Sequence, residues 1–202
     1  MICRPIPVGA RLTDSVTLVT APIALRLKDE GIDGCVQYLG SVTPEIANGI
    51  LNAGLGLLLV TYADAFDGKV AGARAKALRY PAGATVFLDI EGLETLHTET
   101  GLFESEIDNW SKDVEAEGGF MPGIYTGVPQ PLTSTELFLR RPVRYWKGQG
   151  SLRDRFNALV EPACGWCMTQ MYPTVVRGGI EVDFNVVGAD FEGRVPSWAI
   201  AA

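Results

Sequence analysis

The chain has 202 residues, of which 47% are hydrophobic and 20% are charged, and its formal net charge is −7 at pH 7. This length and apolar content suffice to bury one core, which excludes an intrinsically disordered chain. The acidic balance argues against nucleic acid as a partner, because that binding depends on Lys and Arg neutralising phosphates.

Short apolar runs alternate along the chain with longer amphipathic segments, as expected for strands followed by helices. Thr43 is suited to cap a helix whose first position is Pro44, and Ile107, Trp110 and Val114 share one helix face. In chain order, the predicted elements are strand 11–19, helix 22–31, strand 32–40, helix 43–54, strand 55–62, helix 68–81, strand 84–91, helix 103–119, strand 121–127, helix 134–141, strand 142–148, helix 151–160, strand 165–172 and strand 180–187.

Eight strands, most of them followed by a helix, leave an open doubly wound sheet or a closed barrel as the main architectures. The continuous apolar runs indicate strands covered on both faces, as in parallel sheets. No Gly-x-Gly-x-x-Gly motif follows the first strand, and the count of eight favours the barrel. We therefore predict an α/β fold, a single (β/α)8 TIM-type barrel domain over 1–202 with its core at about 12–190. Pro122 conflicts with this prediction, because a closed sheet tolerates Pro mainly at the start of a strand.

The N-terminal sequence MICRPIPVGARL holds two prolines and no apolar core, so it does not predict a signal peptide. The most apolar run, residues 55–63, is too short to cross a bilayer, and no basic run indicates an anionic membrane. We expect the chain to be cytoplasmic at synthesis and to have no membrane partner.

Carboxylates stand where predicted strands end. Asp89 and Glu91 are two residues apart and point the same way in a strand, Asp14 ends the first strand, and Asp183 ends the last. Since barrel active sites lie at the carboxyl ends of the strands, these four side chains should meet at one mouth. Neighbouring carboxylates raise the pKa of at least one of them, which suits a general acid. The set matches glycoside hydrolysis, in which one carboxyl protonates the leaving oxygen and another activates water or stabilises the oxocarbenium-like centre.

Aromatic residues also fall near predicted strand ends, and the flat faces of Tyr and Trp can stack on sugar rings. Single acids and aromatics are common at strand ends for structural reasons, so the prediction depends on the carboxylates taken together. The aromatic residues expected to bind substrate are Tyr38, Tyr62, Tyr125, Trp146 and Tyr172.

Cys164 and Cys167 have the Cys-x-x-Cys spacing of redox motifs and of half a zinc site. No second pair follows, and His97 is the one histidine, so we expect free buried thiols and no metal. His97 lies six residues after Glu91, where it either lines the site or is solvated.

The motifs VFLDIEG, GIYTG, MTQMY and VDFNVV, in this order, resemble the glycoside-hydrolase-like barrels related to the family 25 lysozyme-type muramidases. The chain resembles most the shorter branch, labelled a domain of unknown function, that occurs in actinobacterial secreted proteins and in phage. The segment YLGSVTPEIANGILNAGLGLLLVTY resembles that branch well. The resemblance covers roughly residues 12–190.

The resemblance implies a role for each carboxylate. Glu91 corresponds to the general acid, and Asp89 and Asp183 correspond to supporting carboxylates. Asp14 corresponds to the first-strand Asp, although Leu-Thr-Asp stands here where Gly-x-Asp is usual.

Further residues match the substrate-binding part of the family pattern. Gln170 and Tyr172 match its Gln-x-Tyr motif, with Thr169 in place of the Trp that often precedes the Gln. Asn185 is expected to order the end of the last strand and to belong to the same substrate-binding set.

The resemblance implies a peptidoglycan-type glycan as substrate, cleaved without a metal or an organic cofactor. The first hypothesis is therefore a cell-wall glycan hydrolase, as a phage lysin released at lysis or carried in the virion with phage particle proteins. The second is a catalytically silent glycan-binding or structural module, whose mouth its own segment 126–141 could block. A third hypothesis is a sugar-phosphate or aldolase-type barrel, but the sequence has no strand-end Lys apart from Lys147 and no Gly-rich phosphate loop after strands seven and eight.

Overall fold

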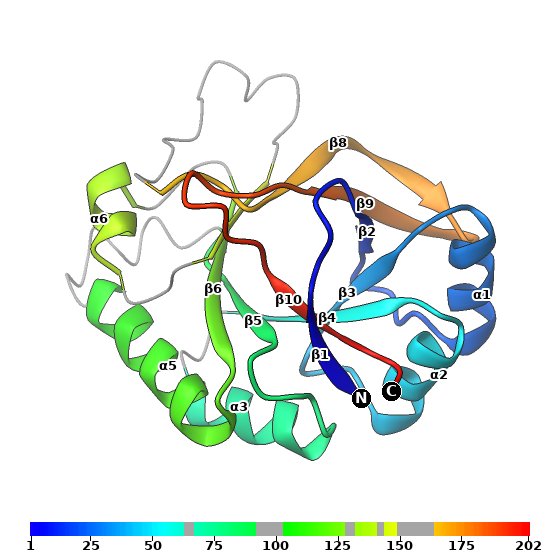
Figure 1. Ribbon diagram of the computed structural model, residues 1–202, viewed down its shortest axis with the longest axis horizontal. Coiled ribbons are helices and arrows are strands. Elements are labelled where there is room, and N and C mark those ends of the chain that lie inside the picture. The colour runs from blue at the N-terminus through cyan, green and yellow to red at the C-terminus, as the bar shows by residue number, and fades with distance from the viewer. Residues whose placement is uncertain (63–66, 92–102, 128–131, 141–143, 149–163) are drawn as a thin grey trace.

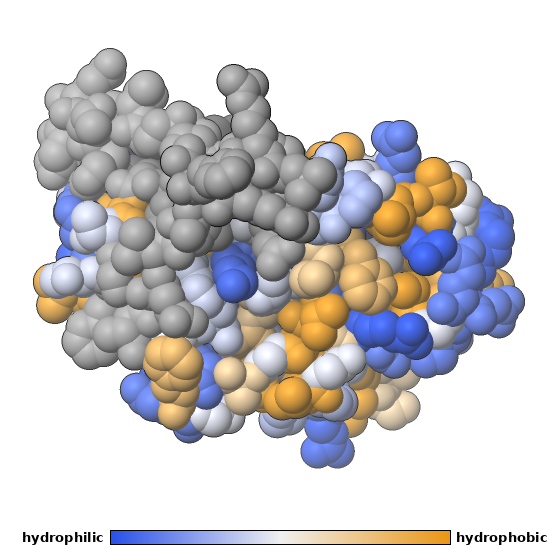
Figure 2. Space-filling model, turned by 90° about the horizontal axis from the view of Figure 1, so that it is seen from above, coloured by the Kyte–Doolittle hydropathy of each residue, from blue (hydrophilic) through white to orange (hydrophobic). Residues whose placement is uncertain are grey.

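The computed structural model describes residues 1–62, 67–91, 103–127, 132–140, 144–148 and 164–202. Within these ranges, none of the helices has the length and apolar character needed to span a membrane. Seen from above, the described surface carries hydrophobic and hydrophilic residues side by side (Figure 2).

Ten strands of the described chain form one sheet around which the helices pack (Figure 1). The strands are β1 Ile2–Pro5, β2 Arg11–Asp14, β3 Gly34–Tyr38, β4 Gly56–Tyr62, β5 Thr85–Asp89, β6 Met121–Thr126, β7 Tyr145–Lys147, β8 Met168–Arg177, β9 Ile180–Val187 and β10 Ser197–Ile200. The helices are α1 Ala21–Asp29, α2 Pro44–Asn52, α3 Gly68–Ala77, α5 Phe103–Gly118 and α6 Ser134–Phe138.

Strands β2 to β9 close into a barrel. Each strand from β2 to β7 is parallel to the next, and β9 closes the ring by pairing antiparallel with both β8 and β2. The prediction of a closed eight-stranded α/β barrel is therefore confirmed.

The last strand of the barrel, β9, is antiparallel to the other seven. β8 and β9 form a hairpin whose turn holds Gly178 and Gly179, both at positive φ (56° and 83°), which glycine adopts readily. Because β9 returns from the mouth, its first half lies beside the carboxyl end of β2, and Asp183 is paired with Asp14. The prediction that Asp183 ends its strand is wrong, since it is an internal residue of β9, yet the reversed direction still brings it to the mouth.

Several local predictions are confirmed by side-chain contacts. The Thr43 side chain accepts a hydrogen bond from the Ile46 N–H (3.3 Å) and so caps α2. On α5, Ile107, Trp110 and Val114 are at most 1% exposed, as the shared helix face predicted. The predicted helix over 151–160 lies outside the described residues.

The first predicted strand is shorter in the structure than in the sequence prediction. β2 ends at Asp14 instead of residue 19, because the Ser15 hydroxyl accepts a hydrogen bond from Thr17 N–H (3.0 Å) and turns the chain.

The structure accommodates Pro122 within the closed sheet. Pro122 is the second residue of β6, and β7 begins only at Tyr145. The N–H that Pro122 lacks therefore falls before the β6–β7 ladder, in which Ile124 donates to the Arg144 carbonyl.

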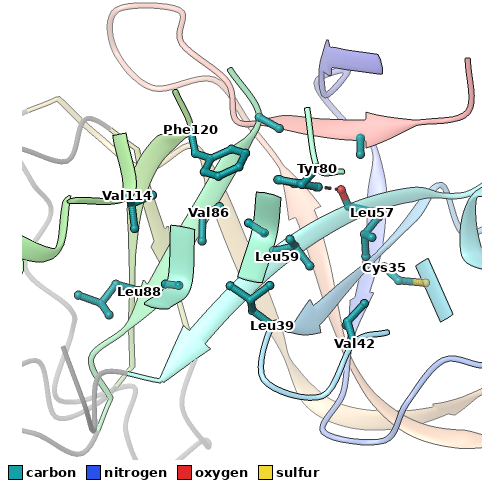
Figure 3. Packing of buried hydrophobic residues seen from close by; sticks show 14 of the residues in the cluster. Cys35, Leu39, Val42, Leu57, Leu59, Tyr80, Val86, Leu88, Val114 and Phe120 are labelled. Carbon is teal, nitrogen blue, oxygen red and sulfur yellow. Dashed lines mark hydrogen bonds between the residues drawn. The ribbon is translucent and has the colours of Figure 1, made fainter. Parts of the chain in front are cut away.

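Two apolar layers flank the barrel wall. The inner layer includes Leu12, Val36 and Phe87, and the outer layer lies between strands and helices. In Figure 3, Leu57, Leu59, Val86 and Leu88 of the strands pack in the outer layer with Val114 and Phe120, and the Tyr80 hydroxyl donates to the Leu57 carbonyl (3.2 Å). Each such buried aliphatic side chain contributes roughly 1.5–3 kcal/mol through burial.

A two-stranded ribbon that the sequence did not predict covers the amino-terminal end of the barrel. β1 pairs antiparallel with β10, which contacts β4 at Ala199 (Figure 1). The Trp198 ring, 7% exposed, lies so close to Gly34 and Gly56, the first residues of β3 and β4, that a Cβ at either position would overlap it. The ordered fold therefore extends beyond residues 12–190.

Candidate active site

An open pocket of about 360 Å³ lies at the carboxyl ends of the barrel strands. Three of the four predicted carboxylates line it, Asp14 from β2, Glu91 just after β5 and Asp183 from β9. The same pocket is lined by four of the predicted aromatic residues, Tyr38, Tyr125, Trp146 and Tyr172. The mouth predicted from the strand ends is thus a real concavity of the described structure.

Asp89 and Glu91 occupy different environments. Asp89 is 5% exposed and does not line the pocket, whereas Glu91 is exposed and does. The Asp89 carboxylate accepts hydrogen bonds from the Glu91 N–H (3.0 Å) and from the Tyr38 hydroxyl (3.1 Å). Burial raises the pKa of Asp89, while these two hydrogen bonds act in the opposite direction. Asp89 therefore holds the backbone from which the Glu91 side chain reaches the pocket.

The Glu91 carboxyl lies against the backbone of Gly127, which follows β6. A Cβ built on Gly127 would overlap the Oε1 and Cδ atoms of Glu91, so only glycine leaves the carboxyl in this place. Sequence inspection pointed to Glu91 but not to the residue that makes room for it.

Gly127→Ala is expected to lower any catalytic rate that depends on Glu91 by up to about 10²-fold, since displacing a reacting group by an ångström can cost that much. The flexible Glu91 side chain can move aside, so the melting temperature should change little. Gly188→Ala is the matched control, because its added methyl would meet nothing nearer than the Trp166 carbonyl at 4.0 Å. Equal rates for both variants would contradict the role of Gly127.

Asp14 and Asp183 lie on adjacent strands on the other side of the mouth. The Gln170 side-chain nitrogen donates to Oδ2 of Asp14 (3.2 Å) and to Oδ2 of Asp183 (3.0 Å). The Asn185 side chain also donates to Oδ2 of Asp14 (2.9 Å), and the Thr174 hydroxyl donates to Asp183. Both carboxylates are therefore held by neutral donors.

Asp14 is 8% exposed, and burial raises its pKa from an ordinary 3.8 to about 7. This pKa is the net result of burial and the charges of Asp183 and Asp89, which raise it, and of the hydrogen bonds from Asn185 and Gln170, which lower it. Asp14 therefore keeps its proton to a higher pH than an exposed aspartate does.

Two residues predicted to bind substrate do not line the pocket. Tyr62 is 49% exposed and stacks on Tyr38 (ring centroids 4.2 Å apart), so it supports the pocket wall from outside. Asn185 is fully buried and donates a hydrogen bond to Asp14 beneath the pocket.

Three of the remaining predicted binding residues, Tyr125, Trp146 and Gln170, form one connected wall. Tyr125 and Trp146 lie 4.3 Å apart between ring centroids, the Tyr125 hydroxyl donates to Gln170 (2.8 Å), and Tyr172 is 48% exposed at the rim. Gly148 leaves room for this contact, because a Cβ there would come within 2.6 Å of the Tyr125 hydroxyl.

Other pocket residues were missed by sequence inspection. They come from the turn after β2 and from the β8–β9 hairpin, and the Gly-Gly turn of that hairpin was the signal that could have indicated them. These residues are Ser15, Val16, Met171, Thr174, Glu181 and Val182.

The thiols of the Cys-x-x-Cys motif are buried. Cys167 donates to the Tyr145 carbonyl (3.2 Å), and burial raises its pKa to about 12, which keeps the thiol protonated and unreactive. Across the described part of the chain, no group of three or more His, Cys, Asp and Glu side chains could hold a metal ion. His97 lies outside the described residues.

No family model and no curated protein matches the chain. Solved structures do. The catalytic domain of an endolysin from a Listeria monocytogenes bacteriophage has a TM-score of 0.63 at 16% identity, with 89% of this chain and 93% of that chain covered. A lysozyme from Streptomyces coelicolor has a TM-score of 0.60 at 16% identity, with 91% and 94% covered.

A glycosyl hydrolase 25 of Streptococcus pneumoniae has a TM-score of 0.61 at 13% identity, with 89% of this chain and 87% of that chain covered. These identities are low, so the likeness concerns the fold. The chain has the barrel fold of the family 25 lysozymes and muramidases, as its strand-end motifs predicted.

Proposed function

We propose that this protein is a glycoside hydrolase that cleaves the glycan of a peptidoglycan-type cell wall by carboxylate acid–base chemistry. The supporting observation is that exposed Glu91 lines the same pocket as Asp14 and Asp183, at the carboxyl end of the barrel. The substrate class is supported by the lysozymes, muramidases and endolysin whose fold the chain has.

In this proposal Glu91 is the general acid. Its side chain lines the pocket, where it can reach the oxygen of a bound glycosidic bond, and Asp89 and Gly127 keep it in place. Protonating that oxygen turns the departing sugar into a neutral leaving group, so the bond breaks without expelling an alkoxide.

Asp14 and Asp183 serve the opposite side of the reaction. Positive charge develops on the sugar ring as the bond breaks, and a carboxylate in a partly dehydrated pocket stabilises it more strongly than water would. Asp183 is the more exposed of the two, and Asp14 shares its hydrogen-bond donor Gln170. We assign the stabilising charge to this pair.

The aromatic residues provide sugar-binding surfaces. Tyr38, Tyr125, Trp146 and Tyr172 surround the pocket, and their rings offer the apolar faces that sugar rings stack against. We further propose that the protein is a phage lysin, either free or carried in the virion, in which case phage particle proteins would be partners. The fold that it shares with the Listeria bacteriophage endolysin domain supports the lysin proposal.

One observation favours a second candidate, a catalytically silent glycan-binding or structural module. Both carboxylate oxygens of Asp183 already accept hydrogen bonds, one from Thr174 and one from Gln170. A carboxylate satisfied within the protein is compatible with a pocket that recognises a glycan and leaves its bonds intact.

The deciding experiment measures release of reducing ends from purified cell walls of several bacterial types, together with sedimentation of the protein with those walls. Release of glycan fragments by the native but not the heat-denatured protein supports the hydrolase. Binding to one wall type without release from any supports the silent module. If the protein neither releases glycan fragments nor binds any of the walls, the result would contradict both candidate functions.

A further inference from the structure

Two side-chain amides, Gln170 on β8 and Asn185 on β9, stand between the aromatic wall and the carboxylate pair. The Trp146 Nε1–H, which can only donate, points at Oδ1 of Asn185 (2.9 Å) and so turns the Asn185 nitrogen toward Asp14. The Tyr125 hydroxyl donates to Oε1 of Gln170 (2.8 Å). The reverse orientation of Gln170 would set its oxygen against two carboxylate oxygens, so the nitrogen faces the acids.

The Gln170 nitrogen has two hydrogens, and two carboxylates use them. One N–H faces Oδ2 of Asp14 (3.2 Å) and the other faces Oδ2 of Asp183 (3.0 Å). Asp14 and Asp183 lie on adjacent strands, and their carboxylates repel each other when both are charged. A neutral donor that binds both carboxylates opposes their separation.

We infer that Gln170 is a positioning residue, which ties Asp14 to Asp183 through one amide nitrogen and is itself oriented by Tyr125. This inference rests on the proposed function, because the reaction that the carboxylate pair serves is the one proposed above. It differs from the expectation that Gln170 mainly binds substrate, since all its polar atoms have partners within the protein.

The ionisable groups around the pair come from several elements. Those that act on Asp14, or line the pocket with it, are Tyr38 on β3, Asp89 on β5, Glu91 after β5, Tyr125 on β6, Tyr172 on β8, and Glu181 and Asp183 on β9. Within the described residues, no cation is among them. Neutral amides are therefore the groups that hold these acids together.

Gln170→Met keeps the length of the side chain and removes its hydrogen bonds. For a positioning residue, kcat on wall glycan should fall about 10- to 100-fold, the size expected for a lost hydrogen bond to a charged group, with KM within about 3-fold of wild type. A residue that mainly contacts substrate would instead raise KM and leave kcat nearly unchanged.

Gln170→Glu adds a conservative test with a pH readout. The introduced carboxyl can donate to the pair only when protonated, and it repels both acids when ionised. Activity relative to wild type should therefore recover toward acidic pH, whereas Gln170→Met should show no such recovery. A purely structural role would give both variants the same pH profile.

A carbon-13 NMR titration of Asp14 tests the contact without requiring turnover. Losing the Gln170 hydrogen bond should move the Asp14 titration to higher pH, because that bond lowers its pKa. Val176→Thr, at an exposed position of the same hairpin that does not line the pocket, should leave the titration and the rate unchanged.

The outcomes separate the two proposals. An unshifted Asp14 titration in Gln170→Met, or a raised KM with wild-type kcat, would overturn the positioning role. A shifted titration in a protein whose wild type cleaves no wall glycan would support the positioning of the pair while refuting the hydrolase.

Discussion

Glu91→Gln is expected to lower the turnover of cell-wall glycan by about 10²- to 10⁴-fold, the usual contribution of a general acid. The amide keeps the size of the side chain and its place against Gly127, but its N–H protons are not acidic enough to be transferred to the leaving oxygen. Glu91 is exposed at the pocket, so the melting temperature should stay close to that of wild type. Initial rates on purified walls, with thermal unfolding measured alongside, test both expectations.

The matched control is Glu45→Gln, which removes one charge from another exposed glutamate, at the start of α2 and outside the pocket. Its rate should equal that of wild type. If Glu91→Gln also retained the full rate in a wild type that turns over, the assignment of Glu91 as general acid would be wrong.

Asp14→Asn is expected to remove much of the pH dependence of stability between about pH 4 and pH 7. The folded pKa of about 7 lies above the ordinary 3.8, so the folded state keeps a proton that the unfolded state has already lost. The contribution of Asp14 to stability is thus fully present below about pH 4 and is lost as the pH rises through 7. By the usual conversion of pKa shifts, the loss is on the order of 4 kcal/mol.

The Asn side chain can accept the same two hydrogen bonds from Gln170 and Asn185 without a buried charge. Asp14→Asn should therefore be more stable than wild type at pH 8 and equal to it near pH 4. Urea unfolding across this range is the measurement, with the exposed Asp29→Asn as control. A variant whose stability falls with pH as steeply as that of wild type would contradict the raised pKa.

Functional sites often give up stability for activity, and a buried carboxyl such as Asp14 with a raised pKa costs stability at neutral pH. If the carboxylate pair stabilises the reacting sugar, Asp14→Asn should gain stability at neutral pH and lose turnover. A gain in stability with full turnover would leave Asp14 as a structural residue of the pocket floor.

Much of the fold could be predicted because its signals are local. Apolar runs such as 55–62 are long enough to mark a buried strand wherever it sits in the sheet. Thr43 and Pro44 mark a helix start through contacts made within one turn of the chain. The spacing of Asp89 and Glu91 at a strand end likewise indicated the mouth of the barrel from adjacent residues.

The sequence alone determined the order of the barrel elements from β2 to β9, because apolar runs and helix caps are signals between residues close together in the chain. It did not reveal β1 and β10, which pair with each other from opposite ends of the chain. The tertiary structure alone decided that Asp89 is buried while Glu91 is exposed, because Tyr38 and the barrel wall cover only the first. It also decided that Gln170 joins Asp14 to Asp183, because β9 runs antiparallel and sets these strands side by side. Burial, strand direction and the pKa of Asp14 arise from neighbours distant in sequence, so no local pattern encodes them.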